Sequence, residues 1–371
     1  MQDGFQEEET VTKTVLVIGG RGRIGRCVAQ DIQQHTQAEV TVTGRNSQLS
    51  QGDFSFIQLD LNDRDRLPTL ISNYDLVVHC AGPFHHRDGR VLKSCIETGV
   101  NYIDVSDHRS FHLRVANYHE AAAKAGVTAI LHTGVFPGIS NIMARQGVEM
   151  LDQADSIHLY YTVAGSGGAG LTVMRTTFLG LQSPFSVWRN GQWEAVSPYS
   201  DRETVTFPHY GDAGVYWFDV AETYTLARSF PVKTVVTKFG SLPDFYNDLT
   251  WISAHRFPRW ILKNPLSLEF LCRMSLTMAR VTDLWSGIGI AVCVAVNGWQ
   301  GDKKLTSWLQ FYHDKTAIAA GIGAGSTAQL LLKEEILQPG VWSIEQAVNT
   351  DLFTSAIGQR GIKIEQVTVE P

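Results

Sequence analysis

The most constraining feature of the chain is a strand, turn and helix pattern near its N-terminus. Residues 15–18 read Val-Leu-Val-Ile, and glycines follow at positions 20, 22 and 25. An apolar strand that ends in a G-x-G-x-x-G turn and continues as a helix is typical of a dinucleotide-binding fold. In that fold Gly20 permits the tight turn, Gly22 lets the backbone approach a pyrophosphate, and Gly25 lets the helix lie close to the strand. The pattern therefore predicts a dinucleotide site, with a ligand-free structural turn as the alternative.

The segment after the turn favours a bound anion. Ile24, Val28 and Ile32 recur every fourth residue with mostly polar residues between them, as in an amphipathic helix packed on a sheet. Free N–H groups at the N-terminus of such a helix, together with its dipole, favour a phosphate. The predicted phosphate-binding residues are Gly20, Arg21, Gly22, Arg23, Ile24 and Gly25.

Strand-like and helix-like segments alternate from residue 13 to about residue 135. This alternation implies right-handed crossovers and a doubly wound parallel sheet, the Rossmann arrangement of the α/β class. From about residue 140 the strands are longer and form hairpins, and Asn190-Gly191 favours a type I′ turn that would place Trp188 opposite Trp193. We therefore expect a second α/β domain built on a largely antiparallel mixed sheet.

The length of 371 residues favours two domains. The predicted division is a disordered tail over 1–12, a Rossmann cofactor-binding domain over 13–140, a substrate and dimerisation domain over 141–314, and C-terminal helices over 315–371.

Composition narrows the partners and the compartment. The net charge of −6 argues against a general nucleic-acid binder. Five scattered cysteines without a C-x-x-C pair suit a reducing compartment. The acidic N-terminus has no apolar signal segment, and the longest apolar run, 287–299, is too short for a membrane helix. We expect a cytoplasmic protein with no transmembrane segment and no nucleic-acid partner.

The residues after the second predicted strand favour NADP over NAD. A NAD-binding protein usually has an acidic residue there for the ribose 2′-hydroxyl, whereas this chain has Arg45 and Asn46. A guanidinium can hold the additional 2′-phosphate, and Arg21 or Arg23 can close on it. The alternative is that these arginines are solvated surface residues. Asp60 either binds the adenine amino group or caps a turn.

The end of the fourth predicted strand should lie near the nicotinamide. Ala81, Gly82 and Pro83 are expected beneath the diphosphate and the nicotinamide ribose, with Phe84 turned towards substrate.

The candidate catalytic residues follow the fifth predicted strand, and His108 has the intrinsic pKa to donate a proton near neutrality. The alternative is that these side chains only stabilise a loop through hydrogen bonds. Adjacent His85 and His86 would point in opposite directions in a strand, so we expect no metal site. The candidate catalytic residues are Tyr102, Asp104, Asp107 and His108.

Three segments carry a family resemblance: DLVVHCAGPF (75–84), CIETGVNYIDVSD (95–107) and GVFPGISNIMA (134–144). With them the chain resembles the saccharopine dehydrogenase-like NADP-binding family, which includes saccharopine reductases, carboxynorspermidine dehydrogenase relatives and lipid enoyl reductases. The resemblance implies a second domain inserted before a C-terminal return to the Rossmann domain, with a substrate cleft between the two. Relatives commonly carry Gly-Glu where this chain has Asp107-His108.

The second domain contributes three candidate substrate residues. Arg175 follows a glycine-rich loop and suits a substrate carboxylate, as in the amino-acid-processing members of the family. Ser140 and Asn141 are expected at the domain junction, lining the same cleft.

These features predict an NADP-dependent oxidoreductase that transfers a hydride to or from a C=N, C=O or C=C bond of a small or lipophilic substrate. The nine tryptophans and the stretch 260–274 favour a lipophilic substrate over a polar amino acid or polyamine. A non-catalytic NADP(H)-binding sensor or assembly factor is the alternative. The second domain has two hairpin-like strand pairs with aromatic faces, which is more apolar strand surface than one small domain readily covers. Because relatives are also often dimeric, we expect a homodimer through that sheet.

Overall fold

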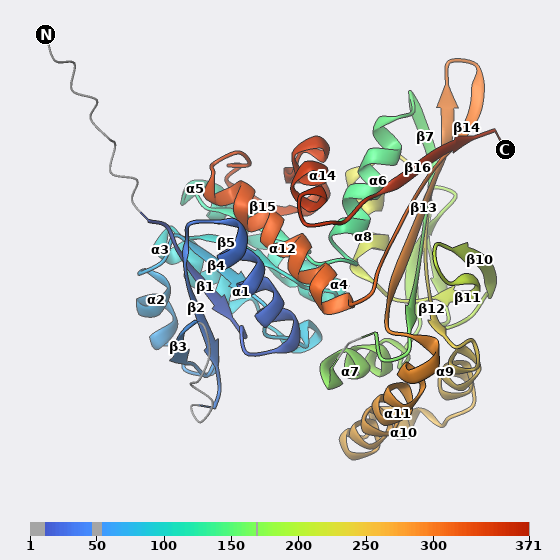
Figure 1. Cartoon of the computed structure of the whole chain (residues 1–371), viewed down its shortest axis with the longest axis horizontal. Helices are drawn as coiled ribbons and strands as arrows, with labels where there is room; N and C mark the ends of the chain where they lie inside the picture. Colours follow the sequence, from blue (N-terminus) through green and yellow to red (C-terminus); the bar gives the residue numbers. More distant parts are fainter. Residues whose placement is uncertain (1–11, 47–53, 168–169, 371) are drawn as a thin grey trace, which may run out of the picture.

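The computed structural model describes residues 12–46, 54–167 and 170–370. All but the last residue of the predicted tail over 1–12 lies outside these ranges. The chain forms two domains, each built around one sheet, that lie side by side (Figure 1).

The first sheet has seven strands in the order β15-β6-β5-β4-β1-β2-β3, and every pair in it is parallel. This order confirms the predicted Rossmann sheet, and β15 adds a strand that the sequence did not reveal. The strands are β1 (Thr14–Ile18), β2 (Glu39–Gly44), β3 (Ser55–Gln58), β4 (Leu76–His79), β5 (Asn101–Asp104), β6 (Thr128–Leu131) and β15 (Gly340–Ser343).

Helices cover both faces of this sheet because side chains alternate along each strand. Val15 and Val17 of β1 face one core, which contains α1 and α12, while Leu16 and Ile18 face the core under four other helices. The helices of the first face are α1 (Arg23–His35) and α12 (Thr316–Leu332). Those of the second are α2 (Arg66–Ile71), α3 (Arg90–Thr98), α4 (Arg109–Val115) and α5 (His119–Lys124).

The second sheet is mixed, as predicted. Its order is β10-β11-β12-β7-β13-β14-β16, with β8 and β9 attached beside β12. Only β7 and β12 pair in parallel, and the other pairings are antiparallel in the described chain. Its strands are β7 (Gln153–Ala164), β8 (Phe185–Arg189), β9 (Gln192–Val196), β10 (Glu203–Phe207), β11 (Gly211–Trp217), β12 (Thr234–Leu242), β13 (Gly289–Gln300), β14 (Lys303–His313) and β16 (Glu365–Val369).

The β8–β9 hairpin forms as the sequence predicts. Asn190 and Gly191 both have positive φ, 52° and 77°, which a type I′ turn requires. Trp188 then pairs with Trp193 across the strands, and their rings lie 5.2 Å apart.

The C-terminal segment returns to the Rossmann domain, except for its last strand. Helix α12 lies so close to α1 that a Cβ on Gly321 would stand 2.8 Å from the Cβ of Cys27. The prediction that all of 315–371 returns to the Rossmann domain is wrong for β16, which pairs with β14 of the second sheet.

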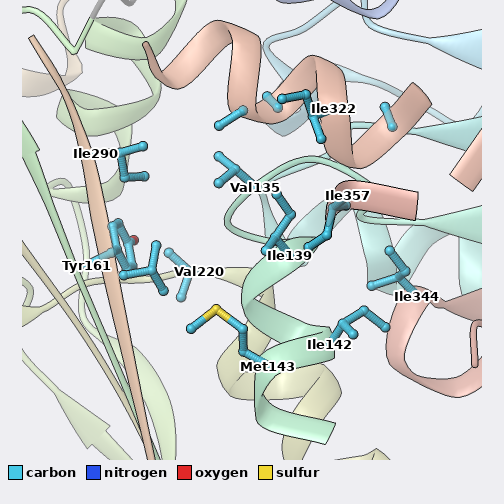
Figure 2. Close-up of a cluster of buried hydrophobic side chains, with 14 of the residues drawn as sticks. Val135, Ile139, Ile142, Met143, Tyr161, Val220, Ile290, Ile322, Ile344 and Ile357 are labelled. Atoms are coloured by element: carbon cyan, nitrogen blue, oxygen red, sulfur yellow. The ribbon is translucent and has the colours of Figure 1, made fainter. Parts of the chain in front are cut away.

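One apolar core joins the two domains. Figure 2 shows Val135 lying between Ile322 of α12 and Tyr161 of β7, with Ile139 and Met143 below it in the same cluster. Val135 precedes helix α6 (Ile139–Glu149), and Ile139 and Met143 belong to it. Because α6 packs on both domains, the orientation of one relative to the other is fixed by close packing.

None of the helices within the described ranges combines the length and the apolarity needed to cross a bilayer.

A buried ion pair between α1 and the C-terminal segment provides a test of this arrangement. Arg360 Nε donates to Asp31 Oδ1 at 2.8 Å, and both side chains are almost fully buried. We expect Arg360→Met to lower the free energy of unfolding by about 3–5 kcal/mol, because it leaves an uncompensated buried carboxylate. Chemical denaturation measures this loss. Lys93→Met, in an exposed pair with Glu97, is the control and should change stability by less than about 0.5 kcal/mol. A loss for Arg360→Met as small as the control's would contradict the account.

Candidate cofactor and substrate site

The predicted site segments meet at one edge of the Rossmann sheet. Strands β1, β2, β4 and β5 run parallel, so the loops that follow them emerge at the same end. Ligands of doubly wound sheets bind at this end.

The glycine turn leaves no room for side chains. A Cβ on Gly20 would lie 2.7 Å from Val42, and one on Gly25 would collide with the carbonyl oxygen of Gly19. The close packing expected of Gly25 is therefore present. The left-handed conformation of the turn falls on Gly19, with φ of 79°. Gly20 is needed because the turn packs against β2.

The N-terminus of α1 is suited to a phosphate. Its first backbone hydrogen bond runs from Arg26 N–H to the carbonyl of Gly22, at 2.9 Å. The N–H groups of Ile24 and Gly25 precede this bond, in the first turn of the helix, where backbone donors have no intrahelical carbonyl to bond. With the helix dipole, such donors suit an anion above the turn.

Basic side chains gather beside the turn, at the end of β2. Arg45 is exposed, and Arg21 donates to the carbonyl of Asn46 at 2.9 Å while lying over the ring of Phe56. No carboxylate follows β2 at Arg45 or Asn46, where a NAD site would have one. Asp60 accepts from the N–H of Asn62 at 2.9 Å, which supports the turn-capping alternative for this residue.

The loop after β4 lies beside the second domain. Arg87 donates to the carbonyls of Ala81 and Gly82, at 2.6 and 3.1 Å. A Cβ on Gly82 would meet Thr172 at an ordinary 3.6 Å, so helix α7 (Leu171–Gly180) lies close to Gly82.

Phe84 does not face the second domain. Its ring is buried between those of His79 and Phe111, with centroids 5.0 and 5.1 Å away. The prediction that Phe84 contacts substrate is therefore wrong, because the short 3-10 turn over 84–86 directs the ring into the core.

Tyr102 and Asp104 form a buried structural network. The Tyr102 hydroxyl donates to Asp104 Oδ2 at 3.0 Å, and Asp104 Oδ1 accepts from Ser106 and from the N–H of His132. Both side chains are fully buried, and burial raises the pKa of the Tyr102 phenol well above its usual range. This network favours the loop-stabilising alternative for these two residues over the predicted catalytic roles.

His108 caps helix α4 and is not a proton donor. Its Nδ1 accepts from the N–H of Ser110 at 3.1 Å, and its Nε2 lies 3.2 Å from His85 Nδ1. Burial, with a smaller contribution from His85, lowers the pKa of His108 to about 3. The imidazole is therefore neutral at pH 7, contrary to the prediction.

Asp107 differs from its neighbour because burial acts on a carboxyl in the opposite sense. Burial raises the pKa of Asp107 to about 6, a hydrogen bond with Thr176 of α7 opposes this effect, and Asp104 adds to it. Asp107 thus lies between the Rossmann edge and α7 with a pKa suited to proton transfer near neutrality.

Two carboxyls that sequence reasoning missed come from the second domain. Asp219 Oδ2 pairs with Arg109 at 3.3 Å, and Glu222, at the start of helix α8 (Ala221–Ser229), accepts from the Ser140 hydroxyl at 3.2 Å. Burial raises the pKa of Asp219 to about 6 and that of Glu222 to about 8. Within the described residues, one buried oxygen of each carboxyl has no hydrogen-bond partner.

These three carboxyls act on one phenol. Burial, and after it Glu222, Asp107, Tyr199 and Asp219, raise the pKa of Tyr161. We call Asp107, Asp219 and Glu222 the carboxyl cluster. Its sequence signal is the acidic segment that directly follows β11, Phe-Asp-Val-Ala-Glu over 218–222.

The other predicted substrate residues are engaged elsewhere. Asn141 is buried and donates to Glu345 at 2.9 Å, so its amide is not offered to a cleft. Ser140 is buried as well, behind Glu222. Arg175 forms an ion pair with Glu269 through two hydrogen bonds, at 2.9 and 2.8 Å. The prediction that Arg175 points into the cleft is therefore wrong.

In the part of the chain that the structure describes, no group of three or more His, Cys, Asp or Glu side chains is arranged to hold a metal ion.

Comparison with known proteins agrees with this geometry. Residues 15–130 match the family model of the saccharopine dehydrogenase NADP-binding domain. The chain carries a saccharopine dehydrogenase NADP-binding domain. The match confirms the predicted family and its NADP cofactor.

The relatives extend beyond this domain. Carboxynorspermidine synthase of Vibrio cholerae is 25% identical, over 85% of this chain and 83% of its own length. Carboxyaminopropylagmatine dehydrogenase of Synechocystis is 20% identical, over 80% of both chains. The structure of saccharopine dehydrogenase from Saccharomyces cerevisiae superposes with a TM-score of 0.71 at 16% identity, covering 96% of this chain and all of that one, so the fold is shared throughout.

The NADP-binding residues can be tested by separating the 2′-phosphate from the rest of the cofactor. We expect Arg45→Ala to weaken NADPH binding by roughly 1.5–3 kcal/mol, the scale of a hydrogen bond to a charged group. That is about tenfold or more in Kd. NADH binding should hardly change. Calorimetric titration with both cofactors measures the difference.

Gly22→Val is the control, because it obstructs the shared pyrophosphate approach and should weaken both cofactors alike. If Arg45→Ala leaves the preference for NADPH over NADH unchanged, Arg45 is a surface charge and discrimination depends on Arg21 or Arg23.

Proposed function

We propose that this protein is an NADP-dependent oxidoreductase that interconverts a C=N bond and a secondary amine in a small cationic substrate. The carboxyl cluster, in which Glu222 is buried and Asp107 and Asp219 are partly buried, carries the proposal. In this view the second domain, residues 141–314, supplies most of the substrate site.

The cluster is suited to an amine for electrostatic reasons. Carboxylates withdrawn from water without full hydrogen bonding are costly, and a bound ammonium group would offset that cost. Asp219 is one such group, with one oxygen paired to Arg109 and the other without a partner in the described chain. Arg109 is also held by the carbonyl of Ser186, at 3.1 Å, and can bind a carboxylate on the same substrate.

Asp107 is the proposed proton donor and acceptor at the substrate nitrogen. When bound, NADPH supplies the hydride for the carbon of the C=N bond. Below its pKa of about 6, Asp107 holds the proton that the nitrogen needs. Glu222, with a pKa of about 8, remains protonated behind it at neutral pH and limits the negative charge of the cluster.

The names of the relatives favour the same substrate class. Carboxynorspermidine and carboxyaminopropylagmatine are carboxylated amines, in keeping with carboxyl groups for the amine and Arg109 for the carboxylate. This supports a polar amine over the lipophilic substrate that the tryptophans suggested, since Trp260 and Trp285 lie exposed on the outside of the molecule.

The pH dependence of turnover tests the role of Asp107. In the reductive direction we expect kcat/KM to fall as pH rises through about 6, because the proton-donating form of Asp107 is lost there. Asp107→Asn should lower kcat by about 10²–10⁴-fold and abolish this limb. NADPH oxidation by mixtures of diamines with aldehydes or 2-oxo acids is the assay.

Two controls accompany this measurement. Asp212→Asn, at an exposed carboxyl on β11, should leave the profile unchanged, as should His108→Gln because His108 is already neutral. NADPH binding by Asp107→Asn reports that the fold is intact. Tight NADPH binding by the native protein without oxidation by any substrate in the panel would contradict the proposal and favour the sensor alternative.

A homodimer through the second sheet is also proposed. Tyr312 of β14 and Val367 of β16 expose large apolar side chains on this sheet. Multi-angle light scattering should give twice the mass of the 371-residue chain. A monomeric mass at working concentrations would contradict it.

A further inference from the structure

Three helices project beyond one end of the second sheet: α9 (Phe245–His255), α10 (Arg259–Lys263) and α11 (Pro265–Ser286). Figure 1 shows them grouped on the far side of α7 from the Rossmann domain. An apolar groove of about 540 Å³ lies between α9 and α11, lined by Phe245, Phe270, Met274 and Val281.

The outer surface of this group is unusually apolar. Leu284 is 87% exposed, Trp285 69% and Trp260 67%. Soluble monomers rarely expose a contiguous apolar patch of this kind unless something binds it. We call this surface the outer apolar face. Its residues are Phe245, Leu249, Ile252, Trp260, Leu266, Phe270, Met274, Val281, Leu284 and Trp285.

The charged side chains on the same helices are mostly cationic. Exposed basic residues include Arg256, Lys263, Arg273 and Arg280, whereas Asp248 is the one acidic side chain classed as fully exposed on the described parts of α9–α11. Two further acidic residues are engaged in the fold. Glu269 pairs with Arg175 and Arg273, and Asp283 accepts from Ser166.

This face is therefore positive on a chain whose net charge is −6. Among the described residues, neither Lys263 nor Arg280 has a carboxylate within ion-pairing distance. The complementary surface is apolar and anionic.

We propose that the outer apolar face docks on an anionic lipid bilayer. Helices that combine Trp, Phe and Leu with Lys and Arg lie in the headgroup region, with the apolar side chains inserted and the cations on lipid phosphates. Trp260 and Trp285 provide the amphipathic rings that favour this depth. The association is peripheral, since none of the described helices is suited to span a bilayer.

A second copy of the chain is the less favourable occupant. A two-fold interface sets the same patch against itself, so the cations of one copy would face those of the other. A bilayer avoids this repulsion and supplies the opposite charge.

The docked face is connected to the candidate site. Glu269 of α11 holds Arg175 of α7, and the neighbouring Thr176 on that helix lowers the pKa of Asp107. Docking through α9–α11 therefore places α7 near the lipid surface, but it does not depend on the proposed reaction.

Vesicle flotation of the full chain tests the proposal. We expect binding to vesicles of phosphatidylcholine mixed with phosphatidylglycerol, and much weaker binding to phosphatidylcholine alone. Lys263→Gln with Arg280→Gln should weaken binding to anionic vesicles by about thirtyfold, at about 1 kcal/mol for each cation. Leu284→Ser with Trp285→Ser should weaken it by at least about tenfold through lost apolar burial.

Leu337→Ser with Leu352→Ser is the matched control, because it removes two exposed leucines remote from α9–α11 and should bind like the native chain. NADPH binding by every variant reports folding. The proposal is overturned if the native chain does not float, or if the Leu284/Trp285 variant floats as well as the control. It is also overturned by a different combination of results. In that case light scattering shows that the native chain is a dimer and the Leu284/Trp285 variant a monomer, and none of the proteins binds vesicles.

Discussion

The packing of helix α6 between the two sheets is the interaction on which the site depends. Its apolar side chains meet the Rossmann helices on one side and β7 and β13 on the other, in one continuous core (Figure 2). Because its side chains are close-packed, such a core leaves the two domains little freedom to move relative to each other. The packing therefore sets the second domain against the carboxyl edge of the Rossmann sheet, with Thr176, Asp219 and Glu222 beside Asp107.

Burial then gives neighbouring groups different chemical properties. Asp107 is partly buried and the adjacent His108 is buried, yet the pKa of the carboxyl rises to about 6 while that of the imidazole falls to about 3. Desolvation disfavours the charged form in each case. One environment thus makes the acid a proton carrier near neutrality and the histidine a neutral helix cap.

Local patterns predicted the parts of the molecule that local physics determines. The glycine turn, the parallel strands and the Asn190-Gly191 hairpin follow from sterics and periodicity over a few residues. The absence of an acidic residue after β2 is read directly from the sequence. Strands β15 and β16 are short and depend on partners far away in sequence, so no periodicity revealed them.

The substrate residues were harder to predict because burial and partners decide their roles. The sequence around Arg175 gives no sign of its ion pair with Glu269, which lies 94 residues further along the chain. Asp219 and Glu222 lie more than 100 residues after Asp107, and the packing of α6 brings them together. A single sequence shows which residue types are present for such a site, but it does not show which of their side chains become buried.

A crystal structure with NADP⁺ and a diamine tests the central claim most directly. We expect the nicotinamide ring over Gly82, the 2′-phosphate at Arg45, and an amine nitrogen within hydrogen-bond distance of both Asp107 and Asp219. A ring bound away from Gly82, or an amine that contacts neither carboxyl, would contradict this claim.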